Sequence, residues 1–238
     1  MNRIFVLVLI CLIVLTGNVT VYGYNADDLN KLRITGSCPR GNLAGANLQG
    51  MNLAGANLEG ANLQGANLYS TQLRRANLAG TNLRDANLSY ASLLQADLHG
   101  AKLVNADLSG AKLSEANLRG ASLQYSSLKN AALDKADLAG AVLSGSDLCG
   151  ANLAQANLQQ ARLDQALLES AHLIKADLRQ ANLQNTRLKY ARLQEANLQN
   201  ADLRDADLEH AITDGADFTS ANLVGAVWTN GEKQLTNP

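Results

Sequence analysis

The chain has 238 residues, of which 20 are basic and 21 acidic, and its formal net charge is −1 at pH 7. This balance excludes a polyanion and a basic nucleic-acid binder, because both classes need strongly one-sided charge. Aromatic residues make up only 4% of the sequence, so any core must be built mainly from Leu and Ala. An irregular globule of this size normally mixes more side-chain shapes to fill its gaps.

The first residues have the layout of a secretory signal peptide. Arg3 supplies a positive end, residues 4–15 form a continuous apolar run, and small residues follow near Gly23. The run is short for a transmembrane helix. We therefore expect a signal peptide over residues 1–23, export to the periplasm or a thylakoid lumen, and no stable membrane insertion after cleavage. Two alternatives stay open: an uncleaved anchor formed by residues 4–22, and an intracellular protein.

Residues 24–40 are expected to form an N-terminal cap that contains a short helix. Asn25 is suited to the N-cap position, acidic residues follow in the first turn, and Gly36 can end the helix. Leu29 and Leu32 would share one face. That face predicts a helix which covers the apolar end of whatever follows it.

A five-residue repeat occupies most of the chain, over residues 41–230. From Leu43 to Trp228 a central residue recurs at every fifth position through 38 units, and it is Leu in all but three. A small residue, most often Ala, stands two positions before it, and a short polar residue lies between them. The period matches neither the 3.6 of a helix nor the 2 of a strand, so it indicates a repeat architecture.

Each unit combines a strand fragment with a corner. The Ala and the Leu point inward and the residue between them points outward, as in a β-strand, while the two variable positions are rich in Gly, Asn, Gln and Ser. Repeated units of this kind predict an all-β solenoid filled by Leu and Ala. We expect residues 231–238 to form a C-terminal tail outside it.

The sequence resembles the pentapeptide-repeat proteins, whose A(D/N)LXX pattern nearly every unit between Ala46 and Leu223 follows. The entry segment, residues 38–43, resembles that of exported cyanobacterial members. The resemblance implies a right-handed quadrilateral β-helix with four units per coil, hence about nine and a half coils. These members often have a second cysteine three residues after Cys38, where this chain has Gly41, so a local disulfide is excluded.

Assigning every fourth unit to one face separates a regular face from an irregular one. The face centred on Leu58 and Leu78 has Asn or Asp before every centre, from Asn57 to Asp217. Such a ladder is either an acidic binding surface or, as we favour, a structural stack of hydrogen-bonded side chains. The face centred on Leu53 and Leu73 departs most from the pattern and mixes cations with apolar residues, which is typical of a protein-binding surface. Its candidate residues are Arg74, Arg75, Leu94, Lys112, Lys135, His172, Ile174, Lys175 and Arg192.

The C-terminal end lacks an amphipathic helix, and Phe218 and Trp228 replace Leu there. An incompletely covered β-edge can pair with a second molecule. Some members of the resembled family dimerise through their C-terminal coils, so a homodimer through this end is expected, with Phe218 and Trp228 as candidate contacts.

No residue cluster indicates catalysis, a metal or a cofactor. The three histidines fall on different faces or distant coils, Cys38 and Cys149 are more than five coils apart, and a convex rod is expected to have no pocket. The leading hypothesis is therefore an exported, non-catalytic scaffold that binds an unknown protein partner through a face or through its end. The alternatives are a membrane-tethered scaffold and a DNA-mimicking topoisomerase (gyrase) modulator, which the resemblance suggests but the weak net charge disfavours.

Overall fold

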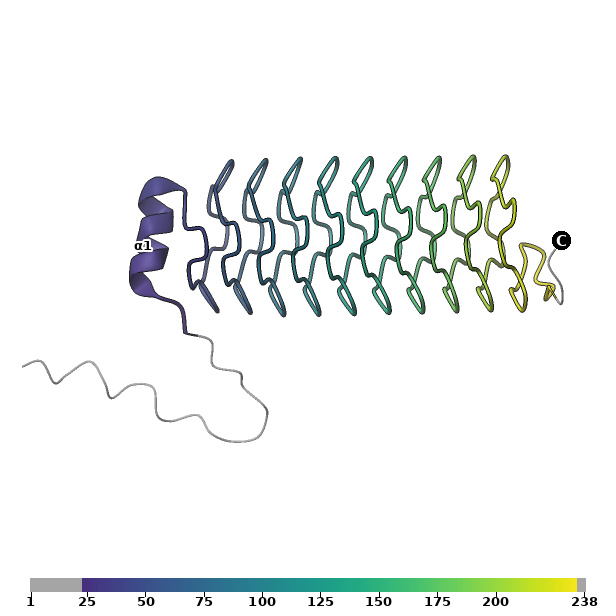
Figure 1. Cartoon of the computed structure of the whole chain (residues 1–238), viewed down its shortest axis with the longest axis horizontal. Helices are drawn as coiled ribbons and strands as arrows, with labels where there is room; N and C mark the ends of the chain where they lie inside the picture. The colour runs from purple at the N-terminus through teal and green to yellow at the C-terminus, as the bar shows by residue number, and fades with distance from the viewer. Residues whose placement is uncertain (1–22, 235–238) are drawn as a thin grey trace, which may run out of the picture.

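The computed structural model of the chain describes residues 23–234, which form a long rod with one helix at its N-terminal end (Figure 1). The predicted signal peptide lies outside the described residues except for Gly23. No helix among residues 23–234 is both long enough and apolar enough to cross a bilayer.

The rod is a solenoid in which each coil takes 20 residues. Parallel β-bridges join each residue that precedes a unit centre to the residue 20 positions later, from Ser37↔Asn57 to Asp207↔Val227. Four five-residue units therefore complete one turn, as the family resemblance implies. Every bridge is isolated, so no extended strand forms within the described residues. The reason is local: a corner follows each bridge before the chain can extend.

The unit around Leu118 shows how the backbone is satisfied. The amide of Leu118 donates to the carbonyl of Asp137 in the next coil at 2.7 Å, and Gly120 donates to Ala139 at 3.0 Å. At the corner, the amide of Ala121 donates back to the carbonyl of Leu118 at 3.0 Å. The same bonds recur along the rod, which explains how a fold of isolated bridges is held together.

Each corner needs one residue with positive φ, the feature of a type II turn. Glycine suits it, but 24 non-glycine residues within the described chain also adopt φ between 53° and 61°. Gln160, at 57°, is one of them. The corners therefore tolerate side chains.

Leu and Ala fill the interior as predicted. Leu118 and its neighbours along the same face are fully buried, and the Ala residues two positions earlier are buried too. Where Ser or Thr replaces that Ala, its hydroxyl donates to a backbone carbonyl; Ser126, for example, reaches Leu123 at 2.7 Å. The polar substitutions are therefore satisfied inside the core.

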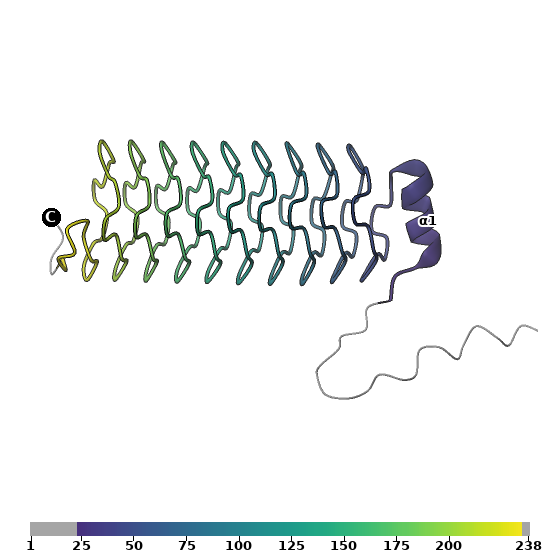
Figure 2. The same cartoon turned by 180° about the vertical axis from the view of Figure 1, so that it is seen from behind.

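Helix α1 (Ala26–Thr35) lies across the first coil, as Figure 1 shows and Figure 2 shows from behind. The side chain of Asn25 accepts from the amide of Asp27 at 2.8 Å, and Gly36 ends the helix in the left-handed conformation. Leu29 and Leu32 are buried against the coil. The predicted short helix, its N-cap residue and its terminating glycine are confirmed.

Replacing Asn25 by alanine should lower the free energy of unfolding by about 1 kcal/mol, because it removes the N-cap acceptor. Urea denaturation followed by circular dichroism measures the loss. Asn30→Ala is the control, since Asn30 is exposed within the same helix. An equal effect of both substitutions would contradict a capping role.

The coil begins earlier than the repeat pattern predicts. Cys38, which we placed in the cap, is buried at the position of a central Leu, and its amide donates to Asn57 in the next coil at 2.8 Å. A Cβ on Gly41 would lie 2.2 Å from the Cys38 sulfur. Glycine is thus required at position 41 because the thiol fills the space of its side chain.

The C-terminal end is better covered than expected. After Trp228 the chain turns back, and Lys233 forms an antiparallel bridge with Val227 (Figure 1). The amide of Trp228 donates to the carbonyl of Glu232 at 2.7 Å. The turn contains Asn230-Gly231, a common hairpin signal. Residues 232–234 of the predicted tail are therefore paired with the last coil.

Candidate protein-binding surfaces

The coil has four faces, which we name after one central residue each: the Leu43, Leu48, Leu53 and Leu58 faces. The columns of β-bridges define them, because each column joins residues 20 apart. Following the chain round one coil visits the faces in that order. The Leu43 and Leu53 faces therefore lie on opposite sides.

The predicted binding residues all belong to the Leu53 face or its following corner, but they form two groups. The structure brings together an N-terminal group around Leu94 and a C-terminal group around His172, which is bridged to Arg192. The smaller residues Ala132 and Asn152 separate them in the bridge column. The N-terminal group is Arg74, Arg75, Leu94, Lys112 and Lys135; the C-terminal group is His172, Ile174, Lys175 and Arg192.

A small hollow marks the N-terminal group. It has a volume of about 160 Å³ and is lined by Arg74, Leu94, Gln95, Ser114 and Glu115. Leu94 and Ile174, expected to be exposed, are half-buried between their neighbours in adjacent coils. Leu94 therefore contributes an apolar floor rather than a protruding contact.

The cations of the two halves of the rod differ in their pairing. Towards the C-terminus most of them bind acids: Lys175 lies 3.3 Å from Glu195 and Lys189 lies 3.4 Å from Asp207, although Arg192 has no ion pair among residues 23–234. In the N-terminal group, the guanidinium of Arg75 donates only to the side-chain oxygen of Gln95, at 2.8 Å, among the described residues. No ion pair or side-chain hydrogen bond within residues 23–234 engages three of the cations, Arg74, Lys112 and Lys135.

The Asn/Asp ladder of the Leu58 face is structural. Asn117 donates to Asp97 of the preceding coil at 2.9 Å, and Asn157 donates to Asp137 at 2.9 Å. Ladder oxygens also accept local backbone amides, as Asp97 does from His99 at 3.1 Å. The favoured structural interpretation therefore explains these residues without a ligand.

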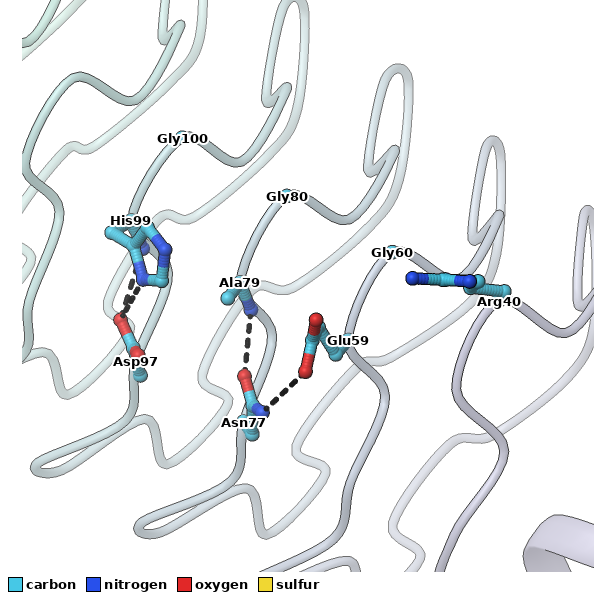
Figure 3. Close-up of a pocket in the computed structure, with 9 residues that line it drawn as sticks. All are labelled: Arg40, Glu59, Gly60, Asn77, Ala79, Gly80, Asp97, His99 and Gly100. Carbon is cyan, nitrogen blue, oxygen red and sulfur yellow. Dashed lines mark hydrogen bonds and ion pairs between the residues drawn. The ribbon is translucent and has the colours of Figure 1, made fainter.

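The same face nevertheless has a groove, which the prediction of a rod without pockets missed. It measures about 480 Å³, and Figure 3 shows it running past the bare corners Gly60, Gly80 and Gly100. The side chain of Arg40 lies over Gly60 at one end. The column of glycines at one corner was a sequence signal for this groove. Which charged residues surround it could be worked out only once the coil length of 20 residues was known. The remaining lining residues are Glu59, Asn77, Ala79, Asp97 and His99.

A third hollow, of about 260 Å³, lies at the C-terminal end between Phe218, Leu223, Trp228 and Gln234. The rings of Phe218 and Trp228 pack edge to face with centroids 5.1 Å apart. The two candidate dimer contacts therefore meet.

Two tyrosines of the N-terminal half pack against each other. The rings of Tyr69 and Tyr90 contact each other with centroids 5.8 Å apart. Tyr90 also lies over Gly110, where an added Cβ would come within 2.7 Å of its ring. These rings therefore pack along the axis of the rod.

Both described cysteines are free thiols. Burial, with Asp28 nearby, raises the pKa of Cys38. Burial also raises the pKa of Cys149 to about 12, helped by its hydrogen bond to Glu169 at 3.1 Å. Neither thiol is poised as a nucleophile. Within residues 23–234 no group of three potential ligands could hold a metal ion.

Comparison with known proteins identifies relatives with the same repeat. The sequence profile of pentapeptide repeats matches residues 42–80, 66–103, 101–138, 133–169, 161–200 and 201–230. No curated sequence matches the chain. Among solved structures, it is similar to HetL, a pentapeptide repeat protein involved in heterocyst differentiation regulation in the cyanobacterium Nostoc sp. strain PCC 7120. The identity is 31% over 90% of this chain and 100% of HetL, with a TM-score of 0.36.

Two further structures are more distant. QnrB1, a plasmid-mediated fluoroquinolone resistance protein, is 20% identical over 66% of this chain and 74% of its own, with a TM-score of 0.41. A protein of the Arabidopsis thaliana thylakoid lumen is 25% identical over 50% of this chain and 68% of its own, with a TM-score of 0.22. The profile match, together with the 20-residue coil, shows that the chain belongs to the pentapeptide-repeat family and has its β-helical fold.

Proposed function

We propose that the protein is an exported, non-catalytic rod that binds a partner protein through the N-terminal group of the Leu53 face. The observation that carries this proposal is the hollow lined by Leu94 and Arg74, with Arg75 and Lys112 in the adjoining positions of the same face; none of the three cations has an ionic partner among residues 23–234. An apolar contact flanked by free charges is typical of a protein interface. The partner should therefore present an acidic surface around an apolar residue.

Reversing the charge of Arg74, Arg75 and Lys112 to Glu should abolish capture of the partner, because the reversed face repels acids. The partner is first identified by pull-down with the unaltered protein and mass spectrometry. Its affinity for the purified protein is then measured by calorimetry, and we expect the reversal to weaken it by about 100-fold or more.

A matched control exists on the opposite face. Arg84→Glu with Lys102→Glu changes exposed charges on the Leu43 face and should leave the affinity unchanged within about threefold. Binding that survives the triple reversal, or that falls equally with the control, would contradict the Leu53 face as the contact.

Export is part of the proposal and rests on residues 1–23 of the sequence. Cell fractionation with N-terminal sequencing tests it: a mature chain that begins near Tyr24, in the periplasm or a thylakoid lumen, is the expected product. A full-length membrane product would favour tethering by residues 4–22. A full-length cytoplasmic product would overturn export and revive the topoisomerase alternative, which the weak net charge and the free cations of the Leu53 face oppose.

We further propose a homodimer through the C-terminal end. The last coil leaves the amides of Thr213 and Phe218 without a backbone acceptor among the described residues, beside the hollow and the exposed Ile212. Light scattering should give twice the monomer mass, and Phe218→Asp should restore the monomer by placing a charge in the contact. A monomer mass for the unaltered protein would contradict the dimer.

A further inference from the structure

The fold does not require the groove of the Leu58 face, because the corners along it could have side chains. Its corners, Gly60, Gly80 and Gly100, have φ near +62°. Corners elsewhere take Gln, Asn or Glu at similar φ. An added Cβ at Gly80 or Gly100 would meet no atom within 4 Å. Side chains could therefore occupy this corner, and their absence leaves the groove open.

The charges along the groove are ordered from one end to the other. Arg40 stands at the N-terminal end, and its guanidinium has no ion pair or hydrogen bond to any residue between 23 and 234. Among residues 23–234, the Glu59 carboxylate accepts only from the side-chain amide of Asn77, at 3.4 Å. Further along, Asp97 uses one oxygen for His99 and Asn117, while its other oxygen has no partner in the described part of the chain. A single cation is thus followed by two carboxylates with unused oxygens.

These features limit the ligand. The two carboxylates repel phosphate-rich ligands, which excludes nucleic acids. The lining residues include no Phe, Tyr, Trp or large aliphatic side chain, so the groove offers little apolar surface to a lipid. From Arg40 to Gly100 the groove crosses three coil steps, roughly 14 Å at about 4.8 Å each. That is about the length of four extended residues.

We infer that this groove binds an extended peptide segment of a partner, lying along the rod axis, with an acidic residue at Arg40 and a basic residue about three positions away at Glu59 and Asp97. Charge complementarity sets both the composition and the direction of the segment. The bare glycines let its backbone approach the corner closely. This binding does not depend on the Leu53 face.

The test uses capped tetrapeptides titrated into the isotope-labelled protein. An acidic and a basic residue separated by two serines should shift the backbone amide signals of Gly60, Gly80 and Gly100, more strongly in one order of the charges than in the other. Gly120 and Gly140, on the same corner beyond the groove, are internal references. Peptides with two acids, two bases or no charge should bind at least about tenfold more weakly.

Filling the groove separates binding from folding. Gly80→Gln places in the groove a residue that other corners accept at the same φ, and it should weaken binding at least about tenfold. Gly120→Gln makes the same change outside the groove and should bind normally. Arg40→Ala should remove the preference for one order of charges. The inference is overturned by absent shifts, by equal binding of the doubly basic or uncharged peptide, or by equal behaviour of the two glutamine variants.

Discussion

Replacing Leu118 by alanine should lower the free energy of unfolding by about 2–5 kcal/mol, the usual cost of a buried Leu-to-Ala change that leaves a cavity. Leu118 is completely buried and stacks between the coils above and below it. The cavity cannot close easily, because backbone hydrogen bonds on both sides fix the spacing of the coils. Urea denaturation followed by circular dichroism measures the change.

Leu167→Ala makes the identical chemical change at an outward, half-buried position of the same rod. It should cost less than about 1 kcal/mol, as surface substitutions usually do. Because each coil contacts only its neighbours, Leu118→Ala should also broaden the transition by uncoupling the two halves of the rod. Similar losses for the two variants would show that the inward and outward positions are wrongly assigned.

The inside of the rod could be predicted from the sequence almost residue by residue, whereas its surface could not. Inward positions repeat every five residues, and the helix cap is marked by local signals at Asn25 and Gly36 that the structure confirms. We did not predict that Cys38 occupies a central position of the first coil, because the repeat was identified by its central Leu. The returning tail escaped because only the short Asn230-Gly231 signal marks it, and its pairing depends on contacts with the last coil.

Ion pairs on the surface join residues about one coil apart in the sequence, so they cannot be predicted until the coil length is known. Arg119 reaches Asp137 and Lys129 reaches Asp147, each 18 residues away, while Lys175 reaches Glu195 at a separation of 20. The same offsets show which charges have no partner. Within residues 23–234, the cations near Leu94 and the guanidinium of Arg40 lack ion pairs, and this is noticeable only by comparison with the mostly paired charges of the C-terminal half.

The difference in ion pairing between the two halves suggests that they have different roles. Charges of the C-terminal half are largely neutralised within the protein, which leaves little field to attract a partner. Both surfaces that we propose to bind protein lie in the first half, next to the end that helix α1 closes. The C-terminal end, in contrast, has aromatic rings and, as far as residue 234, two backbone amides without a backbone acceptor, which suits contact with a second copy of the chain.

Cys149 should react with iodoacetamide at pH 8 about 30- to 60-fold more slowly in the folded protein than in the urea-unfolded chain. Raising its pKa from 9.0 to about 12 lowers the thiolate fraction about 1000-fold, and the greater nucleophilicity of the more basic thiolate restores only part of the rate. Labelling followed by peptide mass spectrometry separates Cys149 from Cys38.

The pH dependence of Cys149 gives the sharper test. Because its pKa is raised in the folded state, the protonated thiol is favoured there, and this contribution to stability is lost as the pH rises from 9 towards 12. In the folded protein the labelling rate should accordingly keep rising beyond pH 10. Glu169→Gln removes a carboxylate that opposes ionisation and should speed labelling, whereas Glu195→Gln, on another face, should not. A rate that levels off near pH 9 would mean that neither burial nor Glu169 controls the thiol.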